Sequence, residues 1–352
     1  MSENNHLFDT IRAMPKIELH RHMEGALRLE TLVDIAREHG IEMPEYTVEN
    51  IRPFVQMMPE EPHTWQNFMA KFQVLRQFFL SEEIIRRITR DTIVDAAQDN
   101  IKYFELRFTP KALGQANNYS LHRVVTWVCD TTAEVAVEYD IEVKLIVSMN
   151  RHESLAIADE TLHAAIAHRH LGVVGLDLAG IESGHSVYPF RHIFKQAREA
   201  GLGITIHAGE WEGPHSVWDA ISNIPLDRIG HGIRVLEDYS LVNVVLDRGI
   251  MLEVCPSSNV LTGVVKDFYG HPLPRLIANG VRTTLNTDDS SVCDVTLSQE
   301  MCRAVAYMPL TLDDLKQQTL TAAKSAFLPP MEKAALVEKF AGWLNYPATG
   351  SD

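Results

Sequence analysis

The sequence has few cysteines and no closely spaced pair of them. Cys129, Cys255, Cys293 and Cys302 lie far apart among 352 residues and form no CxxC motif. This spacing excludes a dense disulfide framework and a zinc cluster built from thiolates.

Long apolar segments and an excess of positive charge are also lacking. No apolar run reaches about 18 residues, the length that crosses a membrane, and the opening MSENNHLFDTIRAMPK contains no apolar core of signal-peptide length. The 32 basic residues are outnumbered by 47 acidic ones, which gives a net charge of −15 and a pI near 5.5. We therefore expect a cytoplasmic protein whose partner is neither nucleic acid nor an anionic membrane.

Several catalytic motifs are absent. The sequence contains no GxSxG elbow, no Walker loop and no HxE…PCxxC signature of the nucleobase deaminases. The nearest match to a glycine-rich phosphate turn, Gly201-Leu202-Gly203, precedes an expected strand instead of following one. This order disfavours an open, doubly wound nucleotide-binding sheet.

The chain instead repeats short β-type runs that end in polar residues. They span residues 17–22, 103–108, 142–149, 173–180, 203–210, 228–232, 251–258 and 282–289. From the second run onward they recur at helix-plus-strand intervals, so we predict an α/β fold with a closed (β/α)₈ TIM barrel. We expect a single domain over residues 1–352, with a helical insertion of about residues 28–100 after the first strand. Residues 310–344 also have a helical pattern.

Histidines and carboxylates gather at the ends of these runs. His20 and His22 are two residues apart on one strand, so their side chains share a face. Further residues of these types end or follow the later runs: His207, Glu210, His231, Asp288 and Asp289. A barrel brings the carboxyl ends of its strands around one axis, where active sites lie. The pattern predicts a metal site there.

Three imidazoles and one carboxylate suit Zn²⁺, and Fe²⁺, Mn²⁺ or Co²⁺ also fit such a set. A hydrolytic mechanism further needs a proton donor that is not a ligand. Glu210, three residues after His207, is placed for this role, while His231 and Asp289 would orient the hydroxide and the substrate.

The same segments resemble the adenosine deaminase family of the amidohydrolase superfamily, over nearly the whole chain. The matching segments, in the order of the family, are MPKIELHRHMEGAL, ELRFTP, DLAG, HAGE with WEGPHSVWDAI, RIGHG, LEVCPSSN and LNTDD. The resemblance implies deamination of adenosine or 2′-deoxyadenosine, with water, to inosine or deoxyinosine and ammonia.

The resemblance also implies roles for single residues. One Zn²⁺ ion would be held by His20, His22, His207 and Asp288. Glu210 would protonate the purine at N1, and His231 would assist the hydroxide that attacks C6. The substrate pocket, for a small-molecule purine nucleoside, would be formed by His22, Glu24, Phe68, Phe72, Gly180 and Asp289.

Two positions depart from the family pattern. Glu24 stands where the family usually has the Asp that binds the ribose 5′-hydroxyl, and Ser290 stands where it usually has Pro. A related 6-aminopurine, 6-aminodeoxyfutalosine or adenine, is therefore the alternative substrate. A two-metal hydrolase would need Lys or Glu at the fourth strand end, which DLAG lacks, and a catalytically silent relative would have lost ligands that are present here. Whether the protein is a monomer or a homo-oligomer stays open.

Overall fold

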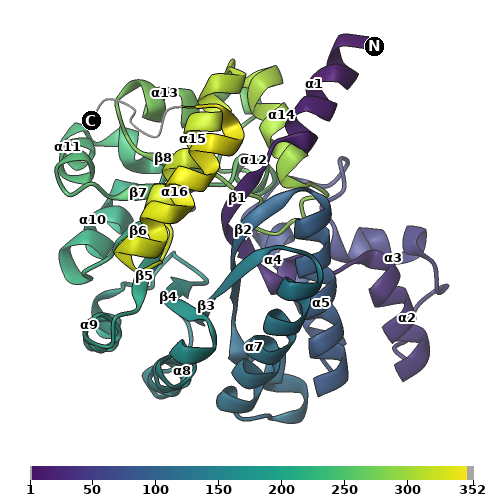
Figure 1. Cartoon of the computed structure of the whole chain (residues 1–352). Helices are drawn as coiled ribbons and strands as arrows, with labels where there is room; N and C mark the ends of the chain where they lie inside the picture. The colour runs from purple at the N-terminus through teal and green to yellow at the C-terminus, as the bar shows by residue number, and fades with distance from the viewer. Residues whose placement is uncertain (1, 347–352) are drawn as a thin grey trace.

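The chain forms a barrel of eight parallel strands in a computed structural model, which describes residues 2–346 (Figure 1). The strands follow one another around the sheet in chain order. They are β1 (Lys16–His22), β2 (Ile101–Phe108), β3 (Glu142–Asn150), β4 (Val173–Ala179), β5 (Gly203–Ala208), β6 (Arg228–His231), β7 (Met251–Val254) and β8 (Thr283–Leu285). Each strand overlaps one of the predicted runs, so the (β/α)₈ prediction is confirmed.

Three strands end earlier than predicted. β5 ends at Ala208, β7 at Val254 and β8 at Leu285, whereas the predicted runs continue two to four residues further. After β7 the cause is local: Pro256 is the first residue of a short helix, α12 (Pro256–Leu261). The last polar residues of these three runs therefore lie in the turns or the short helix that follow the strands.

The first and last strands close the barrel through the candidate site itself. The backbone N–H of His22 donates to the carbonyl of Asp288 (2.7 Å), and the N–H of Asp288 donates to the carbonyl of His20 (3.0 Å). A parallel bridge between Arg21 and Asp288 lies at the same point. Barrel closure thus sets the distance between the backbones of Arg21 and Asp288, which are 267 positions apart in the chain.

Helices surround the strands. They are α1 (Ser2–Ala13), α2 (Leu29–His39), α3 (Val48–Val55), α4 (Trp65–Leu75), α5 (Glu82–Gln98), α6 (Pro110–Gly114), α7 (Leu121–Glu138), α8 (Leu155–Ala167), α9 (Arg191–Glu199), α10 (Pro214–Asn223), α11 (Tyr239–Asp247), α12, α13 (Leu273–Ala278), α14 (Leu297–Tyr307), α15 (Leu312–Ser325) and α16 (Pro330–Leu344). In Figure 1, α15 and α16 lie side by side in yellow, and α1 lies against α14. No helix within residues 2–346 combines the length and apolarity needed to span a membrane.

The segment between β1 and β2 is helical, as predicted for residues 28–100, and contains α2 to α5. Ser81 caps α5, because its side chain accepts a hydrogen bond from the N–H of Ile84 (3.3 Å). Residues 310–344 form α15 and α16, again as predicted.

The interior of the barrel contains charged side chains as well as apolar ones. Glu105, Arg107, Arg228 and Glu253 are each at most 1% exposed, and all lie on strands. Arg228 contacts Glu105 and Glu253 at 2.6 Å each, and Arg107 contacts Glu253 at 2.7 Å. Strands buried on both faces are usually almost continuously apolar, so these ion pairs are a departure that the sequence analysis did not anticipate.

The amino-terminal end of the barrel is covered by the turn between α15 and α16. The Phe327 ring lies 3.5 Å from the guanidinium carbon of Arg228, and the Phe327 N–H donates to Glu105 (2.6 Å). A Cβ atom at Gly175 would come within 2.7 Å of this ring, and one at Gly203 would overlap it. Glycine at the two positions thus makes room for the aromatic cover.

We expect Gly203→Ala to lower the free energy of unfolding by about 1–3 kcal/mol, since the added methyl group overpacks against Phe327. Gly342→Ala is the matched control. Its Cβ would meet nothing within 4 Å in α16, so it should stabilise the protein by about 0.5–1 kcal/mol. Urea denaturation of both variants measures the difference, and equal stability of the two would contradict the packing argument.

Candidate active site

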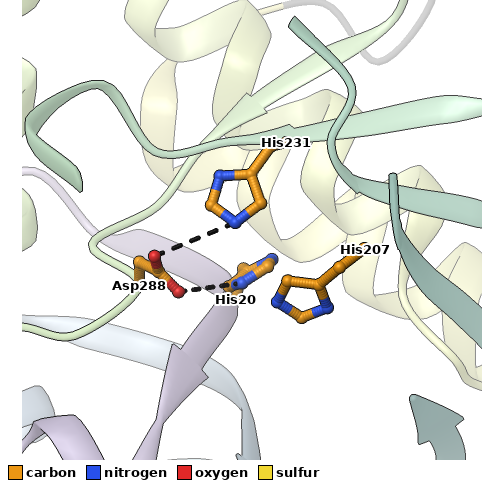
Figure 2. Close-up of side chains that lie close together, drawn as sticks. All are labelled: His20, His207, His231 and Asp288. Carbon is orange, nitrogen blue, oxygen red and sulfur yellow. Dashed lines mark hydrogen bonds and ion pairs between the residues drawn. The ribbon is translucent and has the colours of Figure 1, made fainter. Parts of the chain in front are cut away.

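The side chains predicted to form a site converge at the carboxyl ends of the strands. His20 and His22 come from β1, His207 from β5 and His231 from the last position of β6, while Asp288 follows β8. Figure 2 shows His20 and His231 directed toward the carboxylate of Asp288, with the ring of His207 on the other side of His20. Four of the five are less than 9% exposed, and His22 is slightly more open.

Ligand atoms of four of these residues make successive close contacts. Oδ1 of Asp288 lies 3.1 Å from Nε2 of His20 and 3.5 Å from Nε2 of His22. Nε2 of His22 lies 3.2 Å from Nε2 of His207. These contacts link the four predicted metal ligands, from His20 through Asp288 and His22 to His207.

Buried carboxylates hold two of the rings from behind. Nδ1 of His20 lies 2.7 Å from Oε2 of Glu253, and Nδ1 of His207 lies 3.0 Å from Oδ1 of Asp177. A carboxylate accepts a hydrogen bond, so in each neutral ring the proton is on Nδ1 and Nε2 presents a lone pair. Lone pairs that face one another and a carboxylate oxygen repel, unless a cation lies between them. This donor chemistry fits a divalent metal ion.

His231 is arranged differently. Its Nε2 lies 3.5 Å from Oε2 of Glu210 and 3.8 Å from Oδ2 of Asp288, the carboxylate oxygen directed away from the other rings. Behind it, Nδ2 of Asn259 donates to Nδ1 of His231 (3.1 Å), which leaves the proton of the neutral ring on Nε2. Burial lowers the pKa of His231 well below its ordinary value, so the ring stays neutral.

A second grouping of the same residues is also compact. Ligand atoms of His20, His207, His231 and Asp288 lie within 4.8 Å of one another, and those of His22, Asp177 and His207 form another such set. The Nδ1 atom of His207 is already occupied by Asp177, and Nε2 of His231 carries its proton toward Glu210. We therefore keep His22, and not His231, in the predicted ligand set.

Two of these residues have strained backbones. His231 and Asp288 have φ angles of 60° and 62°, in the left-handed region that residues other than Gly adopt uncommonly. Such strain costs about 1–3 kcal/mol and persists only where the surroundings enforce it. Its presence at two strand ends of one site is typical of a functional site.

Glu210 lies in the turn after β5 and is buried. Burial, followed by repulsion from Asp288 and Glu182, raises the pKa of Glu210 well above its ordinary value. Glu182 holds this turn, since one of its oxygens accepts the N–H groups of Glu210 (3.2 Å), Trp211 (2.8 Å) and Glu212 (3.0 Å). A carboxyl group that stays protonated at neutral pH is a proton donor.

Asp289 is buried beside Glu210, and its Oδ1 has no hydrogen-bond partner among the described residues. Burial, then the charges of Asp288 and Glu24, raises the pKa of Asp289 well above its ordinary value. Gly25 lies directly against it, and a Cβ at Gly25 would overlap its carboxylate. Only glycine there leaves Asp289 in place.

A single cavity connects these groups. Its walls include all six residues predicted for the substrate pocket: His22, Glu24, Phe68, Phe72, Gly180 and Asp289. The structure adds Met69, Arg76, Thr109, Asn150 and Trp211. Trp65 at the start of α4 stacks on Trp211 with ring centroids 5.2 Å apart, which ties the helical insertion to the turn of Glu210. The binding roles of these residues stay predictions.

Glu24 has one oxygen bound and one free. Its Oε1 accepts the N–H of Thr109 (2.6 Å), while Oε2 is buried without a partner among the described residues. Burial raises the pKa of Glu24 to about 7, although the nearby Arg76 opposes this shift. The free oxygen is available to a polar group of a ligand.

The sequence analysis missed Asp177, Glu182, Glu253 and Asn259. A signal existed for two of them: Asp177 and Glu253 are charged residues inside strands that are otherwise apolar, VVGLDLA and MLEV. Nothing local marks Glu182 or Asn259, whose roles depend on turns brought together by the fold.

Comparison with known proteins gives a consistent result. The adenosine deaminase family model matches residues 15–343. An adenosine deaminase of Klebsiella pneumoniae subsp. pneumoniae is 36% identical over 329 residues, which cover 94% of this chain and 98% of that protein.

Among solved structures, an adenine deaminase from Arthrobacter aurescens is 26% identical with a TM-score of 0.86, and the match covers 95% of this chain and all of that one. An N6-methyl-AMP deaminase from Arabidopsis thaliana is 26% identical with a TM-score of 0.83, covering 95% and 98%. These relatives are named for three different adenine compounds.

We expect Asp177→Asn to weaken metal binding by roughly 10–100-fold, because His207 loses the charged partner that orients it. Competition with a chelator during titration of the metal-free protein with Zn²⁺ measures this affinity. Ser148→Ala is the control, since it removes only the hydrogen bond from Ser148 to the other oxygen of Asp177 (2.9 Å). Unchanged affinity in Asp177→Asn would show that this carboxylate does not support a ligand.

Proposed function

We propose that this chain, a hydrolytic deaminase of the adenosine deaminase family, acts on adenosine and 2′-deoxyadenosine with one bound Zn²⁺ ion. The observation that carries this proposal is the set of close contacts that link His20, Asp288, His22 and His207 through three Nε2 atoms and a carboxylate oxygen, beside the buried Glu210, whose pKa is raised. We propose that residues 1–352 act as one hydrolase domain, in which the helices of residues 28–100 cover the pocket.

In this proposal His20, His22, His207 and Asp288 hold the ion. When bound, it supplies Lewis acidity that activates water as a nucleophile near neutral pH. Glu253 and Asp177 orient His20 and His207 through Nδ1, at 2.7 and 3.0 Å. The ligands are therefore positioned before the ion arrives, which reduces the entropy cost of binding.

Glu210 gives its proton to N1 of the purine ring. As the oxygen of water bonds to C6, electrons move from the C6–N1 double bond onto N1, and a proton there prevents negative charge from building up on the ring. The raised pKa of Glu210 keeps that proton available at neutral pH. The 6-amino group then leaves as ammonia, so one nucleoside and one water give inosine or deoxyinosine.

His231 orients the attacking water. Its neutral ring directs Nε2–H into the space shared by Glu210 (3.5 Å) and Asp288 (3.8 Å). The hydrogen bond from Asn259 and the strained backbone fix the direction of the ring. A fixed donor at this position restricts the water to the face of C6.

The nitrogens of the purine ring accept hydrogen bonds, and the pocket offers hydrogen-bond donors to them. A protonated Asp289 donates to one ring nitrogen, and the backbone N–H of Gly180 donates to another. Phe68 and Phe72 lie in the cavity wall with ring centroids 6.0 Å apart and offer an apolar surface to the nucleoside. The free Oε2 of Glu24 accepts a hydrogen bond from the ribose 5′-hydroxyl.

We propose that the enzyme works in the cytoplasm. Its four cysteines are unpaired, and three of them are buried. Unpaired cysteines are kept reduced in that compartment.

Glu210→Gln should lower kcat at least about 100-fold, because an amide has no proton to give to N1. The fall in absorbance as adenosine becomes inosine measures the rate, and elemental analysis should show unchanged metal content. Glu212→Gln is the control, since this neighbouring carboxylate lies outside the cavity wall. Near-normal turnover in Glu210→Gln with metal present would overturn the assignment.

Glu24→Gln tests the substrate. It should lower kcat/KM for adenosine about tenfold, because one hydrogen bond to a charged acceptor is lost. The kcat/KM for 5′-deoxyadenosine, which lacks this hydroxyl, should be nearly unchanged. Ammonia release from the wild-type enzyme with adenosine, 2′-deoxyadenosine, adenine, AMP and 6-aminodeoxyfutalosine gives the reference.

We expect turnover of the first two compounds in that panel to exceed the others by a wide margin. AMP is included because Arg76 lines the cavity, although the carboxylates of Glu24 and Asp288 there oppose a phosphate dianion. Faster turnover of adenine or 6-aminodeoxyfutalosine would establish the alternative substrate, and an equal effect of Glu24→Gln on 5′-deoxyadenosine would remove the 5′-hydroxyl from the role of Glu24.

A further inference from the structure

A second cavity, of about 730 Å³, lies at the amino-terminal end of the barrel, opposite the active site. Val173, Gly203, Arg228 and Met251, which line it, are the first residues of β4, β5, β6 and β7. The loop of Phe327 and the start of α16 complete its wall. Its size is that of a site for a small molecule.

The wall of this cavity is strongly basic, although the chain as a whole carries a charge of −15. Five cations in it have no carboxylate within 4 Å in the part of the chain that the structure describes: Arg169, Arg248, Arg282, Lys324 and Lys333. Further cations there are paired. Arg198 contacts Asp227 at 2.8 Å, and Arg228 is held by the carboxylates inside the barrel.

The unpaired cations come from separate parts of the chain. Arg169 precedes β4, Arg248 follows α11, Arg282 precedes β8, Lys324 ends α15 and Lys333 lies in the first turn of α16. Since the fold brings them from several elements to one cavity, they are not the solvated face of a single helix. Burial, together with the charges of Arg228 and Arg282, lowers the pKa of Lys333, although Glu105 and Asp227 oppose the shift.

The start of α16 adds to the positive potential. Pro329, Glu332 and Lys333 line the cavity, and the first turn of this helix of 15 residues has no side-chain cap. The free N–H groups of a helix amino terminus favour an anion. Glu332, the acidic side chain in this first turn of α16, is exposed and makes no ion pair with a described residue.

We propose that this cavity binds an anion that carries a chain of two or three phosphate groups. Arginine forks bind phosphate oxygens in pairs, and three of the five unpaired cations are arginines. A single phosphate reaches only part of a wall of this size, whereas a phosphate chain can meet cations on several sides. The ligand is either an inorganic polyphosphate or the triphosphate of a nucleotide.

Isothermal titration calorimetry of the metal-loaded protein with inorganic tripolyphosphate, and separately with ATP, tests the proposal at low ionic strength, where screening is weak. We expect both to bind, and more tightly than inorganic phosphate. Equal affinity assigns recognition to the phosphate chain, and tighter binding of ATP assigns the site to a nucleotide. Absence of binding by both compounds would overturn the proposal.

The double variant Arg282→Gln/Lys333→Gln locates the site. It should weaken tripolyphosphate binding at least about tenfold, since two charge-assisted contacts are lost, and leave adenosine deamination unchanged. The control, Arg275→Gln/Lys266→Gln, removes two exposed and unpaired charges outside the cavity and should retain binding.

Three results would contradict the assignment. Equal binding by the two double variants would place the anion elsewhere, and competition with inosine would place it in the active site. Binding of a single-stranded oligonucleotide without binding of tripolyphosphate would replace the small anion by nucleic acid.

Discussion

The buried carboxylate of Glu253 is the interaction on which the rest of the barrel depends. Its Oε2 accepts from Nδ1 of His20 and from Arg107, each at 2.7 Å, and its Oε1 contacts Arg228 (2.6 Å) and Thr205 (3.2 Å). Burial alone would raise its pKa, but the two arginines hold the pKa of Glu253 well below the ordinary range. A charge buried at 0% exposure is tolerated only because every partner is in place.

This arrangement couples the orientation of the two rings of His20 and His207, which we propose as metal ligands. Arg107 contacts Glu253 behind His20 and also Asp177 behind His207, the second at 3.5 Å. Moving either carboxylate leaves the arginine partly unpaired, at a cost of several kcal/mol. The rings are thus fixed by an ionic network inside the barrel, which accounts for charged residues on strands that are otherwise apolar.

The sequence allowed prediction of the parts whose information is local. The two-residue spacing of His20 and His22 and the polar ends of eight runs were enough for the barrel and the set of converging side chains. The strand that contains Glu253 was recognisable from the sequence. The partners of Glu253 lie on other strands, however, and the spacing of residues along the chain does not indicate which of them form ion pairs. Likewise the backbone bridge from Arg21 to Asp288 exists only once the barrel closes.

The net charge of the chain is a poor guide to either end of this barrel. At the mouth, burial raises the pKa of Glu24, Glu210 and Asp289, and the charge of Asp288 adds to the shift of the last two. The charge of Asp288 there opposes a phosphate dianion, while a neutral nucleoside meets Glu210 and Asp289 as hydrogen-bond donors. The opposite end collects unpaired arginines and lysines, where repulsion favours an anion. Local charge at the two ends of the strands, and not the total of −15, therefore decides which molecule each cavity accepts.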